Sequence, residues 1–295
     1  MARTTHRTRG FGRGRMLPAL LGAVALPALS ACSSPAAAPE ASRGAPSMRP
    51  AAVTYTMPAD VSRLVLPTTG AEARGTQGLD GFVKLASAWA VDGCARNHEV
   101  AVPDAPPPMF TRSSDLPDLD FLRIHGFDDG ALVPGAPRRA STAPATAASD
   151  PVVQRCQAEG SAVARELQES YGALLSTWFA ELAPVNRAPK VRQAYGEFAD
   201  CLAAHHVNAV DEAAFFALAD ERRQAGDAAG SRRLASVYAG CMKPVEAVRE
   251  PLRKELNRTF RAAHAAEIAK VRSELPKKIH EFEKRYGIRI AFPKL

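Results

Sequence analysis

The fold class is decided by residues 245–286, which read VEAVREPLRKELNRTFRAAHAAEIAKVRSELPKKIHEFEKRY. Apolar side chains recur in this stretch at every third or fourth position, with one gap that His264 occupies. An α-helix has about 3.6 residues per turn, so this spacing gathers the apolar side chains on one face of a helix. Pro251 and Pro276 are expected to bend that helix. The stretch therefore predicts a long C-terminal helix that buries one side.

The helical spacing extends from this stretch back to Pro151. One apolar stripe precedes Pro184, which is expected to end its helix, and Pro189 is well placed to begin the next. Asp211 fits the N-cap of a further helix. An earlier helical pattern ends at Cys94, and no run alternates with the period of two that a strand requires, so we predict an all-α helical bundle. The stripe before Pro184 consists of Cys156, Val163, Leu167, Leu174, Trp178 and Leu182.

Residues 99–150 interrupt the helical pattern and contain eight prolines. Each interior proline removes a backbone donor and clashes with the preceding turn, so this segment is not helical throughout. Irregular connections of such length usually have a function or are disordered. We expect Phe121–Phe127 to be the only part apolar enough to dock on the bundle, and Pro137–Ser149 to be mobile.

The N-terminus is typical of an export signal. Residues 1–31 contain five arginines and no acidic residue, and Met16–Leu29 is an apolar stretch too short to span a membrane. The next residues, Leu29-Ser30-Ala31-Cys32, resemble a lipobox, the cleavage and lipidation site of bacterial lipoproteins. This resemblance implies cleavage before Cys32 and acyl chains on its thiol and new amine, which anchor the protein at the outer face of the cell membrane. The alternative is an ordinary secretory signal in which Cys32 occurs by chance.

The chain is predicted to have four parts. Residues 1–31 form a lipoprotein signal peptide, and residues 32–58, rich in Ala, Pro and Ser, form a disordered linker. Residues 59–150 contain a helix and the irregular proline-rich segment. Residues 151–295 form a helical bundle that packs with residues 59–150 as one domain.

Five cysteines are present, and four remain when Cys32 is set aside. An even number in an oxidising compartment predicts two disulfides, for which three pairings exist. We favour Cys94–Cys156 and Cys201–Cys241, because the members of each pair are close in sequence and the helical faces of Cys201 and Cys241 are expected to meet. A metal site with thiolate ligands is the alternative, but the chain has no Cys-x-x-Cys pair.

The positive charge of the chain is concentrated at its two ends. The formal net charge is +7, and it falls to +2 when residues 1–31 are left out, so the basic pI is poor support for nucleic-acid binding. Residues 243–295 contain 14 basic and 7 acidic side chains. This excess fits a solvated helix face with ion pairs one turn apart. The alternative is a basic strip that rests on anionic lipid headgroups or an anionic wall polymer.

Histidines are the candidates for a metal or acid–base site. His205 and His264 both lie on apolar stripes, His280 is a third candidate, and neutral imidazoles are good ligands for zinc or copper. No carboxylate has the spacing to orient either ring, so the alternative is a helix-terminal or partly buried, hydrogen-bonded histidine. His98-Glu99 lacks the second histidine four residues later that a zinc protease helix needs.

Four short segments resemble a family of secreted lipoproteins from high-GC Gram-positive (actinobacterial-type) bacteria. They are Cys94–Asp104, similar to the family's C-x-x-x-H-G-V and P-D pattern, Arg123–Phe127, similar to its Arg-Tyr-Gly element, and two cysteine helices, Phe198–Leu202 and Ala239–Lys243. Here Glu99 replaces the family's glycine and His125 replaces the aromatic residue. The resemblance spans about residues 75–290 and implies a helical fold and a lipid-anchored location. It does not imply a catalytic reaction.

These patterns predict a lipid-anchored, extracytoplasmic helical protein that is not an enzyme and needs no cofactor. Its expected role is that of a binding or interaction module at the cell surface. The expected partners are the membrane, through the lipid on Cys32, and a cell-surface protein, an anionic wall polymer or lipid headgroups; nucleic acid is not expected. The alternative is a metal-binding or hydrolytic protein that uses His205 and His264.

Overall fold

In the computed structural model, the described residues are 52–103, 108, 110, 116–127, 132–137 and 147–294. All of them belong to one compact unit that runs from Pro46 to Leu295. The predicted signal peptide and Cys32 lie outside the described residues. Of the residues that are described, 72% are helical and two disulfides are present, which confirms the all-α, disulfide-containing fold class. Among these helices, none has both the length and the apolar character that a membrane span requires.

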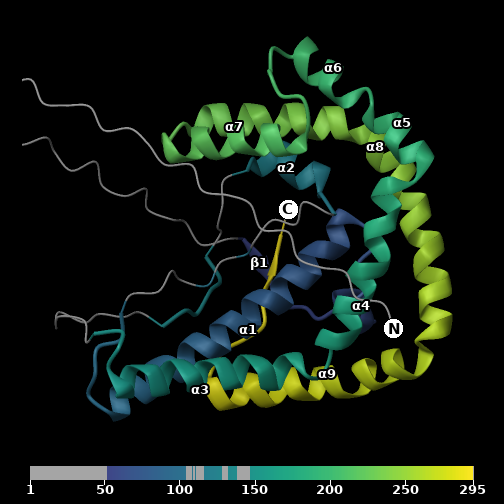
Figure 1. The fold of residues 1–295 in the computed structure, drawn as a ribbon. Coiled ribbons are helices and arrows are strands. Elements are labelled where there is room, and N and C mark those ends of the chain that lie inside the picture. Colours follow the sequence, from purple (N-terminus) through teal and green to yellow (C-terminus); the bar gives the residue numbers. More distant parts are fainter. Residues whose placement is uncertain are drawn as a thin grey trace, which may run out of the picture. The chain divides into compact units, whose positions relative to one another are not determined.

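Helices make up nearly all of the described elements (Figure 1). In chain order these are β1 (Val53–Thr54), η1 (Val61–Leu64), α1 (Gly70–Asn97), α2 (Leu119–His125), α3 (Pro151–Gln168), α4 (Gly172–Leu182), η2 (Ala183–Arg187), α5 (Pro189–Tyr195), α6 (Phe198–Ala204), α7 (Glu212–Gln224), α8 (Ala228–Ala263), α9 (Ala265–Tyr286) and β2 (Phe292–Pro293). The elements η1 and η2 are 3₁₀ helices.

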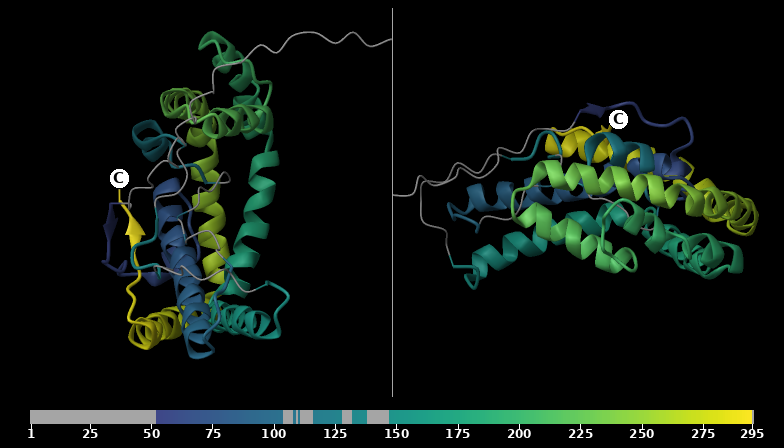
Figure 2. Two further views of the ribbon diagram at one scale, coloured as in Figure 1. Left: turned by 90° about the vertical axis from the view of Figure 1, so that its left-hand side faces the viewer. Right: turned by 90° about the horizontal axis from the view of Figure 1, so that it is seen from above.

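The two short strands join the ends of the described chain. β1 pairs antiparallel with β2, with Val53 opposite Pro293 and Thr54 opposite Phe292 (Figure 2). The linker predicted for residues 32–58 is therefore wrong in its last residues, because Val53–Thr54 belongs to the fold. Two residues per strand are too few to show the alternation on which strand prediction depends.

Helix starts follow from capping side chains in the sequence. Asp211 accepts a hydrogen bond from the backbone N–H of Ala214, which confirms it as an N-cap. Asp150 and Asp227 cap α3 and α8 in the same way, and Thr69 caps α1. Each of these oxygens satisfies a backbone donor that the first turn of a helix leaves free.

The first core lies between α1, α3, α4 and α9. α1 packs along α3, and the disulfide Cys94–Cys156 joins them, with a Cα–Cα distance of 5.4 Å. Trp178 of α4 is fully buried, and its indole N–H donates to the carbonyl oxygen of Pro67 at 2.9 Å. Phe260, near the end of α8, packs edge-to-face on Trp178, so α8 also contributes to this core.

The second core lies against the N-terminal half of α8 and is covered by α2, α5, α6 and α7. Tyr238 is fully buried at its centre among the rings of Phe127, Phe198 and Phe215. The disulfide Cys201–Cys241 joins α6 to α8, with a Cα–Cα distance of 5.6 Å. Both predicted disulfide pairings are thus present in the structure.

Three predicted helices are divided in the structure. The helix expected between Pro151 and Pro184 is interrupted between α3 and α4, and the next one between α5 and α6. The C-terminal helix ends at Ala263, next to the gap in its apolar pattern, and α9 begins at Ala265. The first interruption was hidden because Leu167 and Leu174 keep a spacing of seven residues across it.

The three prolines near the C-terminus do not end a helix. α8 begins at Ala228 and continues through Pro244 and Pro251, and α9 continues through Pro276. Figure 1 shows that α8 is bent rather than straight. The bend agrees with the loss of backbone hydrogen bonds at proline.

The irregular segment contributes to both cores. α2 and the buried Phe127 dock on α8, as predicted for Phe121–Phe127. The prediction that nothing else in the segment docks is wrong, because Phe110, Leu116 and Val133 are buried in the first core. These residues belong to short apolar runs without a helical or strand period, so no periodic pattern reveals them. Most of Pro137–Ser149 lies outside the described residues.

Candidate functional site

The structure does not bring the candidate histidines together. His205 follows α6 and lies beside the Cys201–Cys241 disulfide, whereas His264 lies at the junction of α8 and α9. Twenty-three residues separate Cys241 from His264, on the order of 30 Å of helix at 1.5 Å per residue. The side chain of His280 is 82% exposed, with Nδ1 3.8 Å from a carboxylate oxygen of Glu283. A shared site of His205 and His264 is therefore not formed.

A pocket of about 420 Å³ opens where α3 ends and α4 begins. Leu79, Leu175 and Phe179 give it an apolar lining, and Asp80 of α1 adds a carboxylate. Its volume lies in the range of small-molecule sites, which is about 300–1,000 Å³. Gln168, Tyr171 and Gly172, at the interruption between the two helices, are among the residues that line it.

Tyr171 lies in that interruption and also lines a second pocket of about 230 Å³. Only 5% of its surface is exposed. Burial, together with the nearby charge of Asp80, raises the pKa of the Tyr171 phenol far above its usual range, because both disfavour the phenolate. The hydroxyl therefore stays protonated and is available as a hydrogen-bond donor.

The second pocket contains His264. Its ring stacks on Phe260 with centroids 4.2 Å apart, and its Nδ1 lies 3.5 Å from Glu267 Oε1. The pKa of Glu267 is lowered, first by a hydrogen bond that its carboxylate accepts from the Glu267 backbone N–H and then by the contact with His264. His264 thus fits the alternative expectation of a helix-terminal, hydrogen-bonded histidine. The expectation that no carboxylate has the spacing to orient the ring is wrong for His264, because Glu267 lies three residues later on the same helical face.

The sequence did not predict a buried charge cluster that lies on α8. Glu246, Arg249 and Arg253 are all buried, and an Arg253 nitrogen lies 2.5 Å from Glu246 Oε2. Arg253 Nε donates to the carbonyl oxygen of Thr68 at 2.7 Å, which ties the segment before α1 to α8. Arg249 Nε is buried without a hydrogen-bond partner among the described residues. The sequence spacing does not reveal this cluster, because charged residues at helical intervals are also typical of a solvated helix face.

Tyr195 and Tyr238 continue this polar network. The Tyr238 hydroxyl donates to Glu212 Oε1 at 2.5 Å, and the Tyr195 oxygen accepts from the Glu212 backbone N–H at 2.9 Å. Burial is the main cause that raises the pKa of both phenols, and the negative charge of Glu212 is the second. The pKa of Tyr195 rises to about 12, and the pKa of Tyr238 rises above that of Tyr195. Both phenols stay protonated, so they act as fixed hydrogen-bonding groups rather than as bases.

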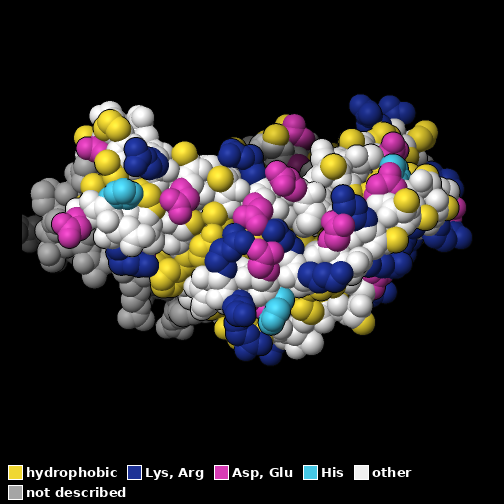
Figure 3. Space-filling view, turned by 90° about the horizontal axis from the view of Figure 1, so that it is seen from below, with side chains coloured by type: hydrophobic (Ala, Val, Ile, Leu, Met, Phe, Trp, Pro, Cys, Tyr) yellow, Lys and Arg dark blue, Asp and Glu magenta, His cyan; other side chains and the backbone are white. Residues whose placement is uncertain are grey.

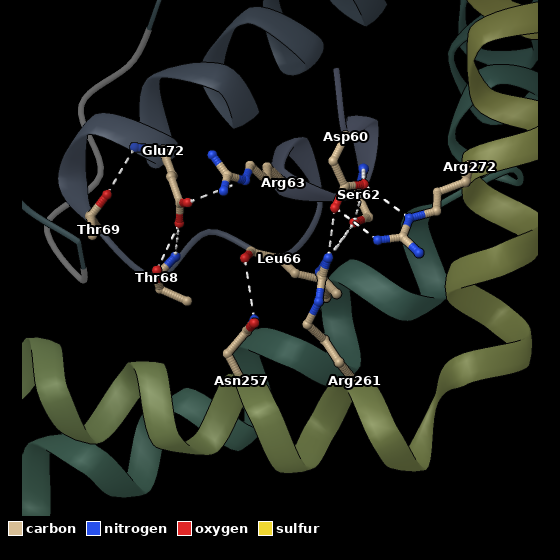
Figure 4. Close-up of polar contacts among 10 residues, drawn as sticks. All are labelled: Asp60, Ser62, Arg63, Leu66, Thr68, Thr69, Glu72, Asn257, Arg261 and Arg272. Carbon is tan, nitrogen blue, oxygen red and sulfur yellow. Dashed lines mark hydrogen bonds and ion pairs between the residues drawn. The ribbon is translucent and has the colours of Figure 1, made fainter. Parts of the chain in front are cut away.

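A second network fastens the N-terminal segment to α8 and α9 (Figure 4). Asp60 accepts hydrogen bonds from Arg272 at 2.8 and 3.0 Å and from Arg261 at 2.7 Å. The Arg272 guanidinium first, with Ser62 and Arg261, holds the pKa of Asp60 well below its usual range. These contacts are internal to the fold, so they position η1 rather than bind a ligand.

Charges of both signs are mixed on the face formed by α3 and α9 (Figure 3). Lys278 Nζ lies 2.5 Å from Glu166, and Arg285 lies 3.0 Å from the other oxygen of the same carboxylate. Lys278 first, and then Arg285, lower the pKa of Glu166. These contacts join α9 to α3 and support the ion-paired face rather than a basic strip.

One group of three metal-binding side chains is present in the described part of the chain. The sulfurs of Cys201 and Cys241 and a ring nitrogen of His205 lie within 4.8 Å of one another. The two cysteines form a disulfide, so their sulfurs are not thiolates in this state. The sequence signal for the group is the spacing of four residues between Cys201 and His205, which places both on one side of a helical turn.

Comparison with known proteins does not assign the chain to a family: no family model, no curated protein and no solved structure matches it.

Proposed function

We propose that the chain is a lipid-anchored helical protein of the outer face of the cell membrane, which binds a small ligand without chemical turnover. Its relatives would be the secreted lipoproteins that it resembles in sequence. The two disulfides support an extracytoplasmic location, because such bonds form and persist in oxidising compartments. The arginine-rich start and the Leu29–Cys32 motif support the lipid anchor.

The pocket at the α3–α4 interruption is the observation that carries the binding role. Leu79, Leu175 and Phe179 offer an apolar surface, and the polar lining includes Tyr171 and Asp80, whose carboxylate lies 2.6 Å from Lys84 Nζ. Such a lining fits a small ligand with an apolar body and a hydroxyl or amine group. No described residues form a nucleophile paired with a base at this pocket, so we propose binding alone.

The binding role is tested with Nile red, a neutral dye whose fluorescence rises in apolar surroundings. The compact unit from Pro46 to Leu295 is compared with Ser176→Trp, which fills the pocket, and with Glu181→Trp, which adds the same side chain on an exposed part of α4. We expect enhancement with the parent chain and Glu181→Trp and at least a tenfold weaker affinity with Ser176→Trp. Equal affinity in all three, or no enhancement in any, would overturn the binding role.

The anchor is tested separately with the full chain produced in a bacterium. Intact mass spectrometry is expected to show a mature chain that begins at Cys32 and carries the mass of acyl chains. Cys32→Ala should lose this mass and leave the membrane fraction. A chain that is cleaved elsewhere and carries no lipid would contradict the lipid anchor and would leave the proposal of ligand binding at the pocket unaffected. Hydrolysis that one histidine substitution abolishes would contradict the non-enzymatic part.

A further inference from the structure

The Cys201–Cys241 disulfide has an imidazole beside it. The two sulfurs and a ring nitrogen of His205 already lie within 4.8 Å of one another. A tetrahedral zinc ion with Zn–S bonds of about 2.3 Å holds its sulfurs about 3.8 Å apart. Opening the disulfide and a small separation of the two side chains would therefore bring the three ligands to zinc-binding distances.

The His205 side chain has no structural partner that explains its position. It is exposed, and no hydrogen bond, ion pair or ring contact involves its imidazole among the described residues. By contrast, His264 stacks on Phe260 and His125 packs on Phe121, with centroids 4.2 and 4.6 Å apart. A free imidazole next to two sulfurs remains available as a metal ligand.

The two disulfides differ in their access to solvent. Cys94 is 5% exposed and Cys156 is fully buried, so a reductant reaches neither sulfur easily. In the other bond, Cys241 is 3% exposed, but Cys201 is only half-buried. Thiol–disulfide exchange begins with attack of a thiolate on an accessible sulfur. A dithiol is therefore expected to reduce Cys201–Cys241 first.

We propose that reduction of Cys201–Cys241 creates a zinc site with His205 as its third ligand. A dithiol transfers two electrons and two protons to the disulfide through a mixed disulfide, and is itself oxidised to a disulfide. Zn²⁺ then binds the two thiols and the His205 imidazole, and two protons pass to solvent. Two thiolates balance the charge of the ion, and the exposed side leaves its fourth position to water.

Zinc would take over the structural task of the disulfide. The bond closes a loop with a sequence separation of 40 residues and holds α6 on α8. Because all three ligands come from these two segments, the bound ion would hold them in nearly the same place. The protein thus exchanges one covalent link for a metal link when a dithiol reduces the bond.

The first test is the order of reduction in the full lipidated chain, kept in a nonionic detergent. The protein is treated with increasing dithiothreitol, alkylated with iodoacetamide and mapped by peptide mass spectrometry. We expect Cys201 and Cys241 to be labelled before Cys94 and Cys156. Labelling of Cys94 and Cys156 first would overturn the proposed switch.

The second test is metal binding by the same protein after reduction with a trialkylphosphine and anaerobic desalting. Co²⁺, a spectroscopic substitute for Zn²⁺, is expected to give one thiolate charge-transfer band per chain, and Zn²⁺ should displace it. The oxidised protein should show no band, and the double variant Cys94→Ser with Cys156→Ser should bind as the reduced parent does. His205→Ala, an exposed change with the fold checked by circular dichroism, should weaken binding by about tenfold or more. No band in the reduced parent, or equal affinity in His205→Ala, would overturn the site.

Discussion

Replacement of Gly160 by alanine is expected to destabilise the protein, although the same change stabilises most helices. In an open helix interior, alanine is favoured over glycine by about 1 kcal/mol. Gly160 lies in α3 on the side that packs against α1, where an added Cβ would overlap the Cγ2 methyl of Val91 and lie 2.9 Å from the carbonyl oxygen of Ser87. The Ser87 oxygen belongs to the backbone, and a valine in a helix has one strongly preferred rotamer, so neither group yields easily.

The size of the effect follows from the contact distances. Carbon atoms pack at about 3.5–4.0 Å, so α1 and α3 would have to move apart by about 1 Å. The Cys94–Cys156 disulfide, four residues from Gly160, resists that movement. Overpacking a filled interface costs about 1–3 kcal/mol. After the helix-propensity gain of about 1 kcal/mol is subtracted, we expect the free energy of unfolding to fall by up to about 2 kcal/mol.

Gly240 provides the matched control. It lies on the exposed side of α8, and no atom is within 4 Å of the position of an added Cβ. Gly240→Ala should therefore raise the free energy of unfolding by up to about 1 kcal/mol. Urea unfolding followed by far-ultraviolet circular dichroism, with both disulfides intact, measures both variants. If Gly160→Ala is stabilised as much as Gly240→Ala, the close approach of α1 and α3 is refuted.

Three further predictions concern the links that hold the fold together. Asp60→Asn keeps the cap of η1 but removes the negative charge that pairs with Arg261 of α8 and Arg272 of α9. The variant should therefore be less stable in urea at pH 7. Since the folded-state pKa of Asp60 is lowered, its contribution is complete above about pH 4 and is lost in more acidic solution, where the two urea midpoints should converge. A chain that begins at residue 59 lacks β1 and should melt at a lower temperature than one that begins at residue 46; equal melting would show that the β1–β2 pairing adds nothing. Replacing Cys94 and Cys156 by serine opens a loop with a sequence separation of 62 residues and should cost about 4 kcal/mol by chain entropy, measured as the change in the urea midpoint.

Features that repeat along a helix were predictable from the sequence. The apolar stripes gave the all-α class, Asp211 gave a helix start, and the even cysteine count with local pairing gave both disulfides. Even the gap at His264 marked a real boundary, although the stretch was interpreted as one helix. Such signals are local, so one chain segment is enough to read them.

Features that depend on distant segments were not predictable. The pocket is lined in part by residues at the interruption after Gln168, where α3 ends, and an apolar spacing of seven residues across the interruption conceals that end. The burial of Arg253 depends on the carbonyl oxygen of Thr68, which is 185 residues away in sequence. β1 has two residues and is a strand only because β2 lies beside it. In each case the missing information is a tertiary contact rather than a propensity.

Each of the two disulfides stabilises a different core. Cys94–Cys156 joins α1 and α3 in the first core, which also lines the proposed ligand pocket, and both of its sulfurs are buried. Cys201–Cys241 joins α6 to α8 in the second core, and its Cys201 is only half-buried, so a reductant reaches this bond more easily than the first. Reduction of the accessible bond therefore loosens α6 while the helices around the pocket stay linked. A redox change and the proposed metal site would thus act on one core, while ligand binding at the α3–α4 pocket proceeds on the other.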